Sequence, residues 1–310
     1  MLAEDAQQRL GSMKEVCVIL IEERLWGMEW AKKMNAALDY LESNLTGEIS
    51  YAEAAARADC PAYHFQRMFS YLAGFPLSDY IRRRKLTLAA ADLQVGGSKV
   101  IDIALKYGYE SPEAFTRAFG QLHGLAPAEA RKPGARLIAC PRLTFQFEPL
   151  GGLNMNYRLE KLPPFRTIGM SARVQTNTAF EEVPILWGKA AEQGAFARFI
   201  ELGEPGGPPG ILGICAGGSW GQGEAFDYIL GTVSRQPAPG GWTDIDFPES
   251  LWAVFEAEGH PEKLQEIWSR FYREWLPAAG YELADLPAIE AYLHPEENRN
   301  ELWIPVISRA

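Results

Sequence analysis

PAYHFQRMFSYLAG (residues 61–74) and SPEAFTRAFGQLHG (residues 111–124) are one helical pattern written twice, fifty positions apart. Five positions carry the same residue in both copies: Phe65 and Phe115, Arg67 and Arg117, Phe69 and Phe119, Leu72 and Leu122, Gly74 and Gly124. Apolar residues in each copy follow the spacing i, i+3, i+4, i+7, which places them on one face of a helix. The closing glycines suit the left-handed conformation that often ends a helix. The sequence therefore predicts two equivalent amphipathic helices.

A shorter helix is expected before each copy, from Tyr51 to Ala58 and from Lys99 to Lys106, with a brief turn before the longer helix. Pro61 and Pro112 suit the first turn of that longer helix, and Ser111 suits an N-cap. Two helices joined by a short turn, the second with an arginine on its polar face, are typical of a helix-turn-helix unit. This region thus predicts two such units.

Two further helices would hold these units together. An amphipathic helix from Glu29 to Asn44 is expected to pack beneath the first unit, and a long helix from Leu77 to Leu93 is expected to join the units rigidly. Two units held at a fixed distance could enter successive major grooves, about 34 Å apart on one face of DNA. We therefore expect double-stranded DNA as a partner.

The residues of this region resemble the DNA-binding domain of AraC/XylS transcription regulators over roughly a hundred positions. The resemblance is carried by Ile49-Ser50, Ala54-Ala55, Gln66-Arg67-Met68-Phe69, Gly74, Tyr80-Ile81-Arg82, Arg84-Lys85-Leu86, Ala90, Ile103-Ala104, Gly108-Tyr109, Ser111, Phe115-Thr116-Arg117-Ala118-Phe119, Gly124 and Pro127. It implies that Tyr63, Gln66 and Arg67 face the bases. Glutamine can pair with adenine and arginine with guanine, each contact giving about 1–3 kcal/mol of discrimination.

Phosphate contacts are expected from Arg82, Arg84 and Lys85 and from helix N-termini, so that DNA binding should weaken steeply with salt. In the second unit the candidate contacts are Ser111, Glu113 and Arg117. This unit departs from family members with several polar residues at the start of the helix, because it offers Pro112, Glu113 and Ala114. We infer that it holds the DNA backbone more than it reads bases. For Arg67 and Arg117, a structural salt bridge or a phosphate contact stays an equal alternative.

The charge is distributed unevenly along the 310 residues, whose formal net charge is −10. Residues 28–133 carry 13 basic against 12 acidic side chains, whereas residues 134–310 carry 14 against 23. The acidic half cannot be the DNA surface. We therefore divide the chain into an unassigned extension (1–27), a DNA-binding domain (28–133, closed by the short linker Arg131–Gly134) and a second domain (134–310).

Other site classes find little support in the sequence. Four cysteines (Cys17, Cys60, Cys140 and Cys215) and four histidines (His64, His123, His260 and His294) show no metal-ligand spacing, so neither a metal nor a cofactor is expected. The apolar run from Val16 to Ile21 is too short for an export signal or a membrane span. We expect a cytoplasmic protein without a membrane partner.

Alternating strands and two helices are expected in the second half, which predicts a duplicated α+β domain. The helices run from Ala179 to Ile200 and from Glu262 to Ala278, with Trp187 and Trp268 near their middles. The strands lie at Leu143–Phe147, Asn156–Leu159, Arg166–Val174, Ile211–Cys215, Ala225–Val233, Trp252–Glu256, Ala288–His294 and Leu302–Ile307.

This half resembles a GyrI-like effector-binding domain from about residue 137 to the end. The resemblance is carried by Ile185-Leu186-Trp187, Phe226-Asp227-Tyr228-Ile229-Leu230-Gly231, Trp275-Leu276-Pro277, Gly280-Tyr281-Glu282, Pro287, Glu290, Tyr292 and Trp303-Ile304-Pro305-Val306. An AraC-type domain followed by such a domain is a Rob-like arrangement. The resemblance implies a transcription regulator whose second domain senses a small molecule.

Alternation places Glu290, Tyr292 and His294 on one face of their strand, and the residues alone favour a solvent-facing carboxylate. The resemblance reverses this, because family members turn the matching glutamate into a cavity. With Trp187, Tyr228, Tyr292 and Trp252 as candidate walls, a buried carboxylate there needs a cation. We therefore expect a loosely selective sensor of cationic or amphipathic organic molecules, as in multidrug sensing.

Two other functions stay open. Glu290 could act as a general base, since some GyrI-like relatives are hydrolases, although no Ser-His-Asp or Cys-His arrangement supports catalysis. The acidic domain could instead be a protein-contact module without a ligand, and RNA polymerase is a candidate partner.

Overall fold

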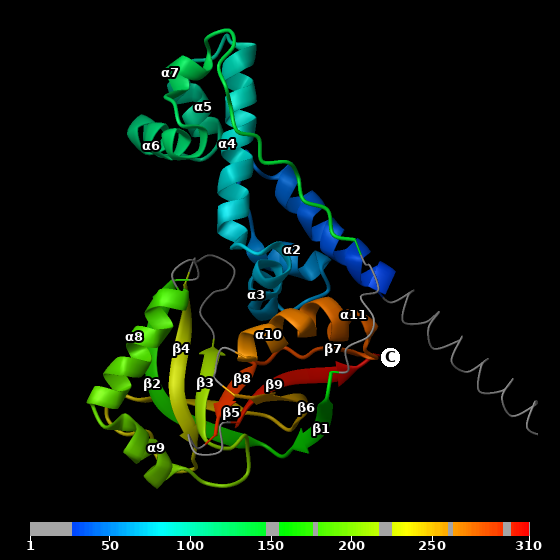
Figure 1. Cartoon of the computed structure of the whole chain (residues 1–310), viewed down its shortest axis with the longest axis vertical. Helices are drawn as coiled ribbons and strands as arrows, with labels where there is room; N and C mark the ends of the chain where they lie inside the picture. Colours follow the sequence, from blue (N-terminus) through cyan, green and yellow to red (C-terminus); the bar gives the residue numbers. More distant parts are fainter. Residues whose placement is uncertain are drawn as a thin grey trace, which may run out of the picture.

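A helical domain stands on one end of a β-sheet domain, as Figure 1 shows. The computed structural model describes residues 27–146, 155–175, 179–216, 225–259, 263–293 and 299–309, and the side chains of residues 62, 63 and 180 lie outside this description. The predicted order, an all-α part followed by an α+β part, is confirmed. Of the predicted extension 1–27, only the last residue lies within the described part.

The helical domain has the elements that the repeat predicts. A helix over residues 27–43 is followed by α2 (Tyr51–Arg57), α3 (Ala62–Ala73), α4 (Leu77–Val95), α5 (Val100–Lys106), α6 (Pro112–His123) and α7 (Pro127–Ala130). Ser111 caps α6, because its hydroxyl accepts a hydrogen bond from the backbone N–H of Ala114 at 3.1 Å. Gly74 and Gly124 end α3 and α6 with φ of 81° and 73°, in the left-handed region.

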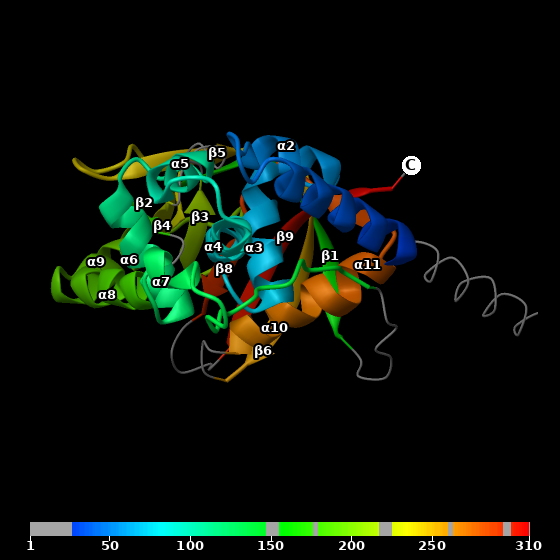
Figure 2. The same ribbon diagram turned by 90° about the horizontal axis from the view of Figure 1, so that it is seen from above.

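Helix α4 contributes residues to two hydrophobic cores, one in each helix-turn-helix unit, and so holds the two units apart. In the first unit, Phe65 and Phe69 of α3 pack with Leu38 of the helix over residues 27–43. In the second unit, Phe115 and Phe119 of α6 pack with residues of α5 and α7. Seen from above in Figure 2, α4 stands end-on over the sheet domain.

The chain after α7 returns along the helical domain. Cys140 donates its backbone N–H to Thr87 at 3.0 Å, and Phe145 exchanges two hydrogen bonds with the Asn35 side chain at 2.8 and 2.9 Å. Residues 143–146 form no strand, so the strand predicted there is wrong for the described residues. Alternation misled the prediction because Leu143 and Phe145 insert into the first-unit core from an irregular segment. Residues 135–146 therefore run along the helical domain as an irregular segment.

The described strands of the second domain form a nine-stranded antiparallel sheet in the order β1-β6-β9-β8-β3-β4-β2-β5, with β7 paired to β9. Their bounds are β1 Tyr157–Leu162, β2 Phe165–Gln175, β3 Ile211–Ala216, β4 Ala225–Val233, β5 Thr243–Phe247, β6 Ser250–Glu258, β7 Tyr281–Leu283, β8 Ile289–Tyr292 and β9 Arg299–Ser308. The short strands β5 and β7 were not predicted. The other strands agree with prediction to within a few residues.

The sheet curls, so that its two ends approach each other. Phe165 of β2 and Trp252 of β6 lie far apart in the strand order, yet their ring centroids are 6.0 Å apart. Phe247 and Trp303 pack with them inside the curl. This core is separate from the face of the sheet that carries the helices.

Two groups of helices cover the outer face. Helices α8 (Ala179–Glu192) and α9 (Ala195–Leu202) pack on β2, β3 and β4. Helix α10 (Lys263–Arg270) packs on β6 and β9 and continues through the short π-helix η1 (Phe271–Trp275) into α11 (Leu276–Ala278). The single helix predicted from Ala179 to Ile200 is divided at Gly194, whose φ is 67°.

One hydrophobic core runs through both domains. Met68 and Phe69 of α3 belong to the same cluster of buried residues as Trp268 and Phe271. Figures 1 and 2 both show α3 beside α10. Among the described helices, none combines the length and the apolar character that crossing a membrane requires.

Candidate functional site

Glu290 lies at the junction of the two domains and is only 7% exposed. One carboxylate oxygen, Oε1, accepts hydrogen bonds from Trp268 Nε1 and from Arg67 Nη2, both at 2.8 Å. The other oxygen, Oε2, accepts from the Tyr292 hydroxyl at 2.8 Å. Glu290 and Tyr292 thus lie on the same face of β8, as alternation along the strand requires, with Glu290 buried and Tyr292 half-buried. The cation that neutralises this carboxylate comes from α3 of the other domain.

Arg67 inserts its guanidinium into an aromatic setting. Its Cζ lies 3.8 Å from the centroid of the Trp268 ring, and its Nη1 donates to Cys215 Sγ at 3.3 Å. The side chain is 18% exposed. A cation held over an indole face and hydrogen-bonded to a carboxylate gains both cation–π and charge-assisted stabilisation. Arg67 thus occupies a formed cation-binding position.

Aromatic side chains of the two halves of the domain adjoin this position. Trp187 of α8 donates its Nε1–H to the Tyr228 hydroxyl at 3.0 Å, and its ring meets the Tyr292 ring edge-on with centroids 4.6 Å apart. Burial raises the pKa of Tyr228 well above its usual value, and the charge of Glu290 adds to the shift. Both phenols therefore stay protonated and can donate hydrogen bonds. The predicted walls Trp187, Tyr228 and Tyr292 are brought together beside Glu290.

Gly213 of β3 makes room for these rings. Gly213 pairs with Glu290 on the neighbouring strand β8, and a Cβ atom at position 213 would collide with the Tyr228 hydroxyl. A side chain larger than hydrogen would push Tyr228 away from Trp187.

Trp252 does not join the site, and this part of the prediction is corrected. It is fully buried and packs against Phe165 and Phe247 inside the curl of the sheet. Its place follows from strand parity, because Trp252 shares its face with Val254, which stands opposite Trp303 on β9. Glu290 stands opposite Leu302, one residue earlier on β9, and so points to the other face.

Trp268 of α10 was missed as a site residue. Tyr272 of η1 stacks on Trp268 with centroids 5.5 Å apart. Tyr71 of α3 lies 6.0 Å from Trp268 and 5.8 Å from Tyr272, so the three rings form one triangular cluster. The expected repeat placed Trp187 and Trp268 at equivalent points of two helices. Because Trp187 was predicted to line the ligand site, its equivalence to Trp268 could have indicated that Trp268 lines the site as well.

The face of α3 that was expected to read bases lies against the second domain. His64, Arg67 and Tyr71 follow the spacing i, i+3, i+7 and form one stripe. His64 Nε2 is hydrogen-bonded to the Leu286 carbonyl at 3.0 Å, and Arg273 donates to the Tyr71 carbonyl at 2.9 Å. Gln66 is 4% exposed, and the Tyr63 side chain lies outside the described part. Base contacts by this face stay a prediction, and they require another arrangement of the domains.

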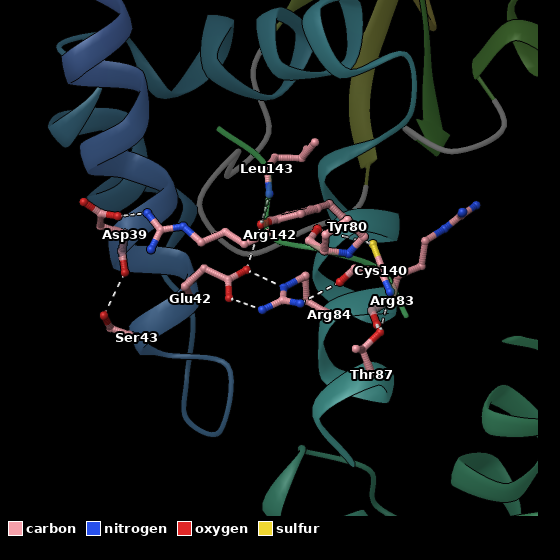
Figure 3. A network of polar contacts seen from close by, with 11 residues as sticks. Asp39, Glu42, Ser43, Tyr80, Arg83, Arg84, Thr87, Cys140, Arg142 and Leu143 are labelled. Carbon is pink, nitrogen blue, oxygen red and sulfur yellow. Dashed lines mark hydrogen bonds and ion pairs between the residues drawn. The ribbon is translucent and has the colours of Figure 1, made fainter. Parts of the chain in front are cut away.

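The basic run on α4 is divided between exposed and buried side chains, and in Figure 3 Arg84 turns toward Glu42 while Arg83 points away from it. Arg84 is bound bidentately by Glu42 at 2.8 and 2.7 Å, and its Nη1 donates to the Cys140 carbonyl at 2.6 Å. Arg84 was expected to contact a DNA phosphate, but in the structure its guanidinium is held inside the helical domain by Glu42 and Cys140. Arg82 stays on the surface in an ion pair with Asp79, and Lys85 is half-buried, which lowers the pKa of its ammonium group.

The second unit presents its candidate residues outward. Glu113 and Arg117 of α6 are exposed, while Ser111 serves as the N-cap of the helix. Within the described ranges, no three His, Cys, Asp or Glu side chains gather closely enough to hold a metal ion.

Two family descriptions match the chain. Residues 155–307 match the GyrI-like small molecule binding domain, and residues 54–133 match a helix-turn-helix domain. Together they cover the two parts that the fold separates.

Two curated relatives are transcriptional or DNA-binding proteins by name. The HTH-type transcriptional activator AarP of Providencia stuartii is 40% identical over 91 residues, which are 29% of this chain and 67% of AarP. The Right origin-binding protein of Escherichia coli (strain K12) is 32% identical over 156 residues, which are 45% of this chain and 54% of that protein. The chain thus spans two thirds of the first relative and about half of the second.

Similar solved structures exist for each part. SAV2435 bound to tetraphenylphosphonium is 21% identical with a TM-score of 0.44, and the match covers 49% of this chain and 94% of that one. A transcriptional regulator of Chromobacterium violaceum with an AraC-type DNA-binding domain is 23% identical with a TM-score of 0.31, over 33% of this chain and 96% of that one.

Proposed function

Since the chain belongs to the AraC/XylS family of transcription regulators and carries a C-terminal GyrI-like small-molecule binding domain, we propose that it binds DNA through its two helix-turn-helix units and senses an organic cation at Glu290. AarP, the relative of which the chain covers two thirds, is a transcriptional activator by name. We propose that the ligand is bound without being turned over and that the protein acts in the cytoplasm. Contact with RNA polymerase stays a further prediction.

The effector part of this proposal rests on the charge of Glu290, which is neutralised from outside the second domain. Among the described residues, the cation paired with Glu290 belongs to α3, and none in the second domain pairs with it. A buried carboxylate without a cation costs several kcal/mol. The second domain by itself therefore presents a carboxylate, an indole and two phenols that an organic cation would satisfy.

A second buried carboxylate of the same sheet gives the contrast. Glu301 of β9 accepts from Arg158 of β1 at 2.9 Å and from Trp303 Nε1 at 2.9 Å, and Arg158 lies over the Trp303 ring at 5.5 Å. This Arg–Trp–Glu group is complete within the domain. The equivalent group at Glu290 is completed only from outside the domain, which supports an exchangeable cation there.

Calorimetric titration tests the effector site. Tetraphenylphosphonium serves as the cationic probe, and neutral triphenylphosphine oxide as its control of similar shape. We expect the wild-type chain to bind the cation more tightly than the neutral compound, and Glu290→Gln to lose this preference. Equal affinities of both chains for the cation would refute the role of the Glu290 charge.

DNA binding is tested by selecting duplexes from a random pool with the purified full chain and sequencing them. We expect an enriched motif in two parts separated by about one helical turn, because α4 holds the two units apart. A selected pool without any motif would contradict sequence-specific binding.

A further inference from the structure

We propose that Arg67 acts as an internal substitute for the cationic effector, so that the domain arrangement seen here and effector binding exclude each other at Glu290 and Trp268. This inference rests on the proposed function, because it takes Glu290 to be the ionic partner of the effector. It adds the way in which the effector would control DNA binding. We call the arrangement in which α3 contacts α10 and η1 the docked state.

The contacts of Arg67 are those that a ligand cation would make. Its guanidinium pairs with Glu290 at 2.8 Å and covers the Trp268 ring at 3.8 Å, beside the Cys215 sulfur. Trp268 is itself oriented by its hydrogen bond to Glu290 at 2.8 Å. One carboxylate and one indole face thus form a single cation position, and Arg67 fills it.

Two cations cannot share this position. Arg67 and an effector would compete for Glu290 Oε1 and for the same face of Trp268, and their like charges would repel each other in a poorly solvated site. Effector binding therefore requires Arg67 to withdraw. Because Arg67 lies in the middle of α3, its withdrawal also weakens the neighbouring contacts of His64 and Tyr71 with the second domain.

The same withdrawal exposes the helix that the AraC-type unit is expected to place in the major groove. In the docked state Gln66 and Arg67 are covered, so α3 cannot reach base edges. Glu113 and Arg117 on α6 of the second unit are exposed, and Figure 1 shows α6 beside the part of α4 that is away from the sheet domain. The docked protein therefore offers one helix-turn-helix unit to DNA, and the undocked protein offers both.

Cooperativity between effector and DNA follows. The effector at Glu290 and the DNA at α3 both need sites that are blocked in the docked state, so both favour the undocked state. Each ligand must therefore raise the affinity for the other by the same factor. The docked state is held by a hydrophobic core that both domains share, which keeps it dominant without a ligand. The effector acts only through its preference for the undocked state.

Two variants weaken docking without touching the cation position or the base-facing residues. Arg273→Ala removes the hydrogen bond to the Tyr71 carbonyl, and Gln265→Ala removes the acceptor of the Tyr71 hydroxyl. Both side chains belong to the second domain and lie on α10 or η1. Glu290→Gln is the third variant, since it removes the charge that holds Arg67.

The experiment measures two quantities on the full chain, with and without tetraphenylphosphonium. The first is the affinity for a duplex that the wild-type chain selects. The second is amide hydrogen exchange in α3, with α6 as the internal reference. We expect the probe to tighten DNA binding of the wild-type chain and to speed exchange in α3 but not in α6. Arg273→Ala and Gln265→Ala should each tighten DNA binding without the probe by about threefold to tenfold, the effect of one hydrogen bond.

Glu290→Gln should tighten DNA binding without the probe and should no longer respond to it. If the probe binds the wild-type chain but changes neither DNA affinity nor exchange in α3, the proposed effector site stands and the competition with Arg67 is overturned. If the probe does not bind while all three variants tighten DNA binding, the cationic effector is overturned and the docked contact is an inhibitory one of another kind.

Discussion

Glu42 and Arg84 form a bidentate ion pair that joins the helix over residues 27–43 to α4, with both side chains only 12% exposed. The Tyr80 hydroxyl donates to the same carboxylate at 2.7 Å, and Arg84 also donates to the Cys140 carbonyl. The Glu42 hydrogen bond raises the pKa of the Arg84 guanidinium, so Arg84 stays charged. Arg84 therefore fastens three segments of the helical domain together.

Arg84→Ala is expected to destabilise the helical domain by about 3–5 kcal/mol, because the substitution leaves the Glu42 carboxylate partly buried without its cation. The matched control is Arg83→Ala at the preceding position of α4, where the ion pair with Asp79 is exposed and contributes about 1 kcal/mol or less. Urea unfolding followed by circular dichroism measures both. Equal losses in the two variants would show that Arg84 has no structural role.

Gly213→Ala is expected to weaken binding of tetraphenylphosphonium by about tenfold, because the added Cβ displaces Tyr228 from its hydrogen bond with Trp187. Gly188→Ala is a suitable control, since a Cβ at that position meets no atom within 4 Å and lies on the outside of α8. Calorimetry gives the affinities. Unchanged binding by Gly213→Ala would show that the position of Tyr228 does not matter to the ligand.

The two tryptophans proposed for the site should behave differently. Trp187→Leu removes the ring that meets Tyr292 and should lower the affinity for the probe with little loss of stability, since Trp187 is only half-buried. Trp252→Leu should lower the free energy of unfolding by about 2 kcal/mol or more through the cavity it leaves, with affinity within about twofold of wild type. A loss of probe affinity in Trp252→Leu at unchanged stability would reverse this assignment.

Local periodicity accounts for what could be predicted. Apolar spacing and closing glycines were sufficient for α3 and α6, and strict alternation placed Glu290 and Tyr292 on one face of β8. Both signals act over a few residues. The strand expected at Leu143 shows the limit, because alternation also occurs where an irregular segment drops every second side chain into a core.

The pairing of Arg67 with Glu290 could not be predicted, because the two residues are 223 positions apart and belong to different domains. A polar arginine on a helix face suits a base, a phosphate or a carboxylate equally well. From the sequence, Arg82 and Arg84 could not be distinguished, because both belong to one basic run. Their separation into a buried and an exposed side chain depends on Glu42, which a different helix supplies.

Arg117→Ala tests how the second unit binds DNA. Arg117 is exposed on α6, and Glu113 stands one turn earlier on the same helix. If Arg117 contacts a phosphate, the variant should bind all duplexes less tightly, and the slope of log affinity against log salt concentration should fall by about one. Glu113→Gln should tighten binding slightly by removing a repelling charge. A change in the selected motif at an unchanged salt slope would instead make Arg117 a base-reading residue.

The docked state should weaken as the pH falls, through His64. Burial, together with the nearby charge of Arg67, lowers the pKa of His64 from 6.5 to about 3, although its hydrogen bond to Leu286 acts in the opposite direction. We take the pKa to return toward 6.5 when α3 leaves the second domain. Above pH 6.5 the ring is neutral in both states, so docking does not depend on pH there. Below pH 6.5, His64 takes up a proton in the undocked state but stays neutral in the docked state. The free energy of docking therefore becomes less favourable by about 1.4 kcal/mol for each pH unit, down to about pH 3.

Between pH 7.5 and 5.5 the equilibrium should therefore shift about tenfold toward the undocked state. The ratio of amide exchange in α3 to that in α6 measures this shift, because the intrinsic effect of pH on exchange cancels in the ratio. His64→Gln keeps a polar side chain opposite the Leu286 carbonyl but cannot titrate, so its ratio should stay constant. His123→Gln serves as a second control, since His123 is buried beside Phe119 in the second unit and its hydrogen bonds go to Leu86 and Ile138, away from α10 and η1. If wild type and His64→Gln keep the same ratio at both pH values, His64 does not couple docking to pH.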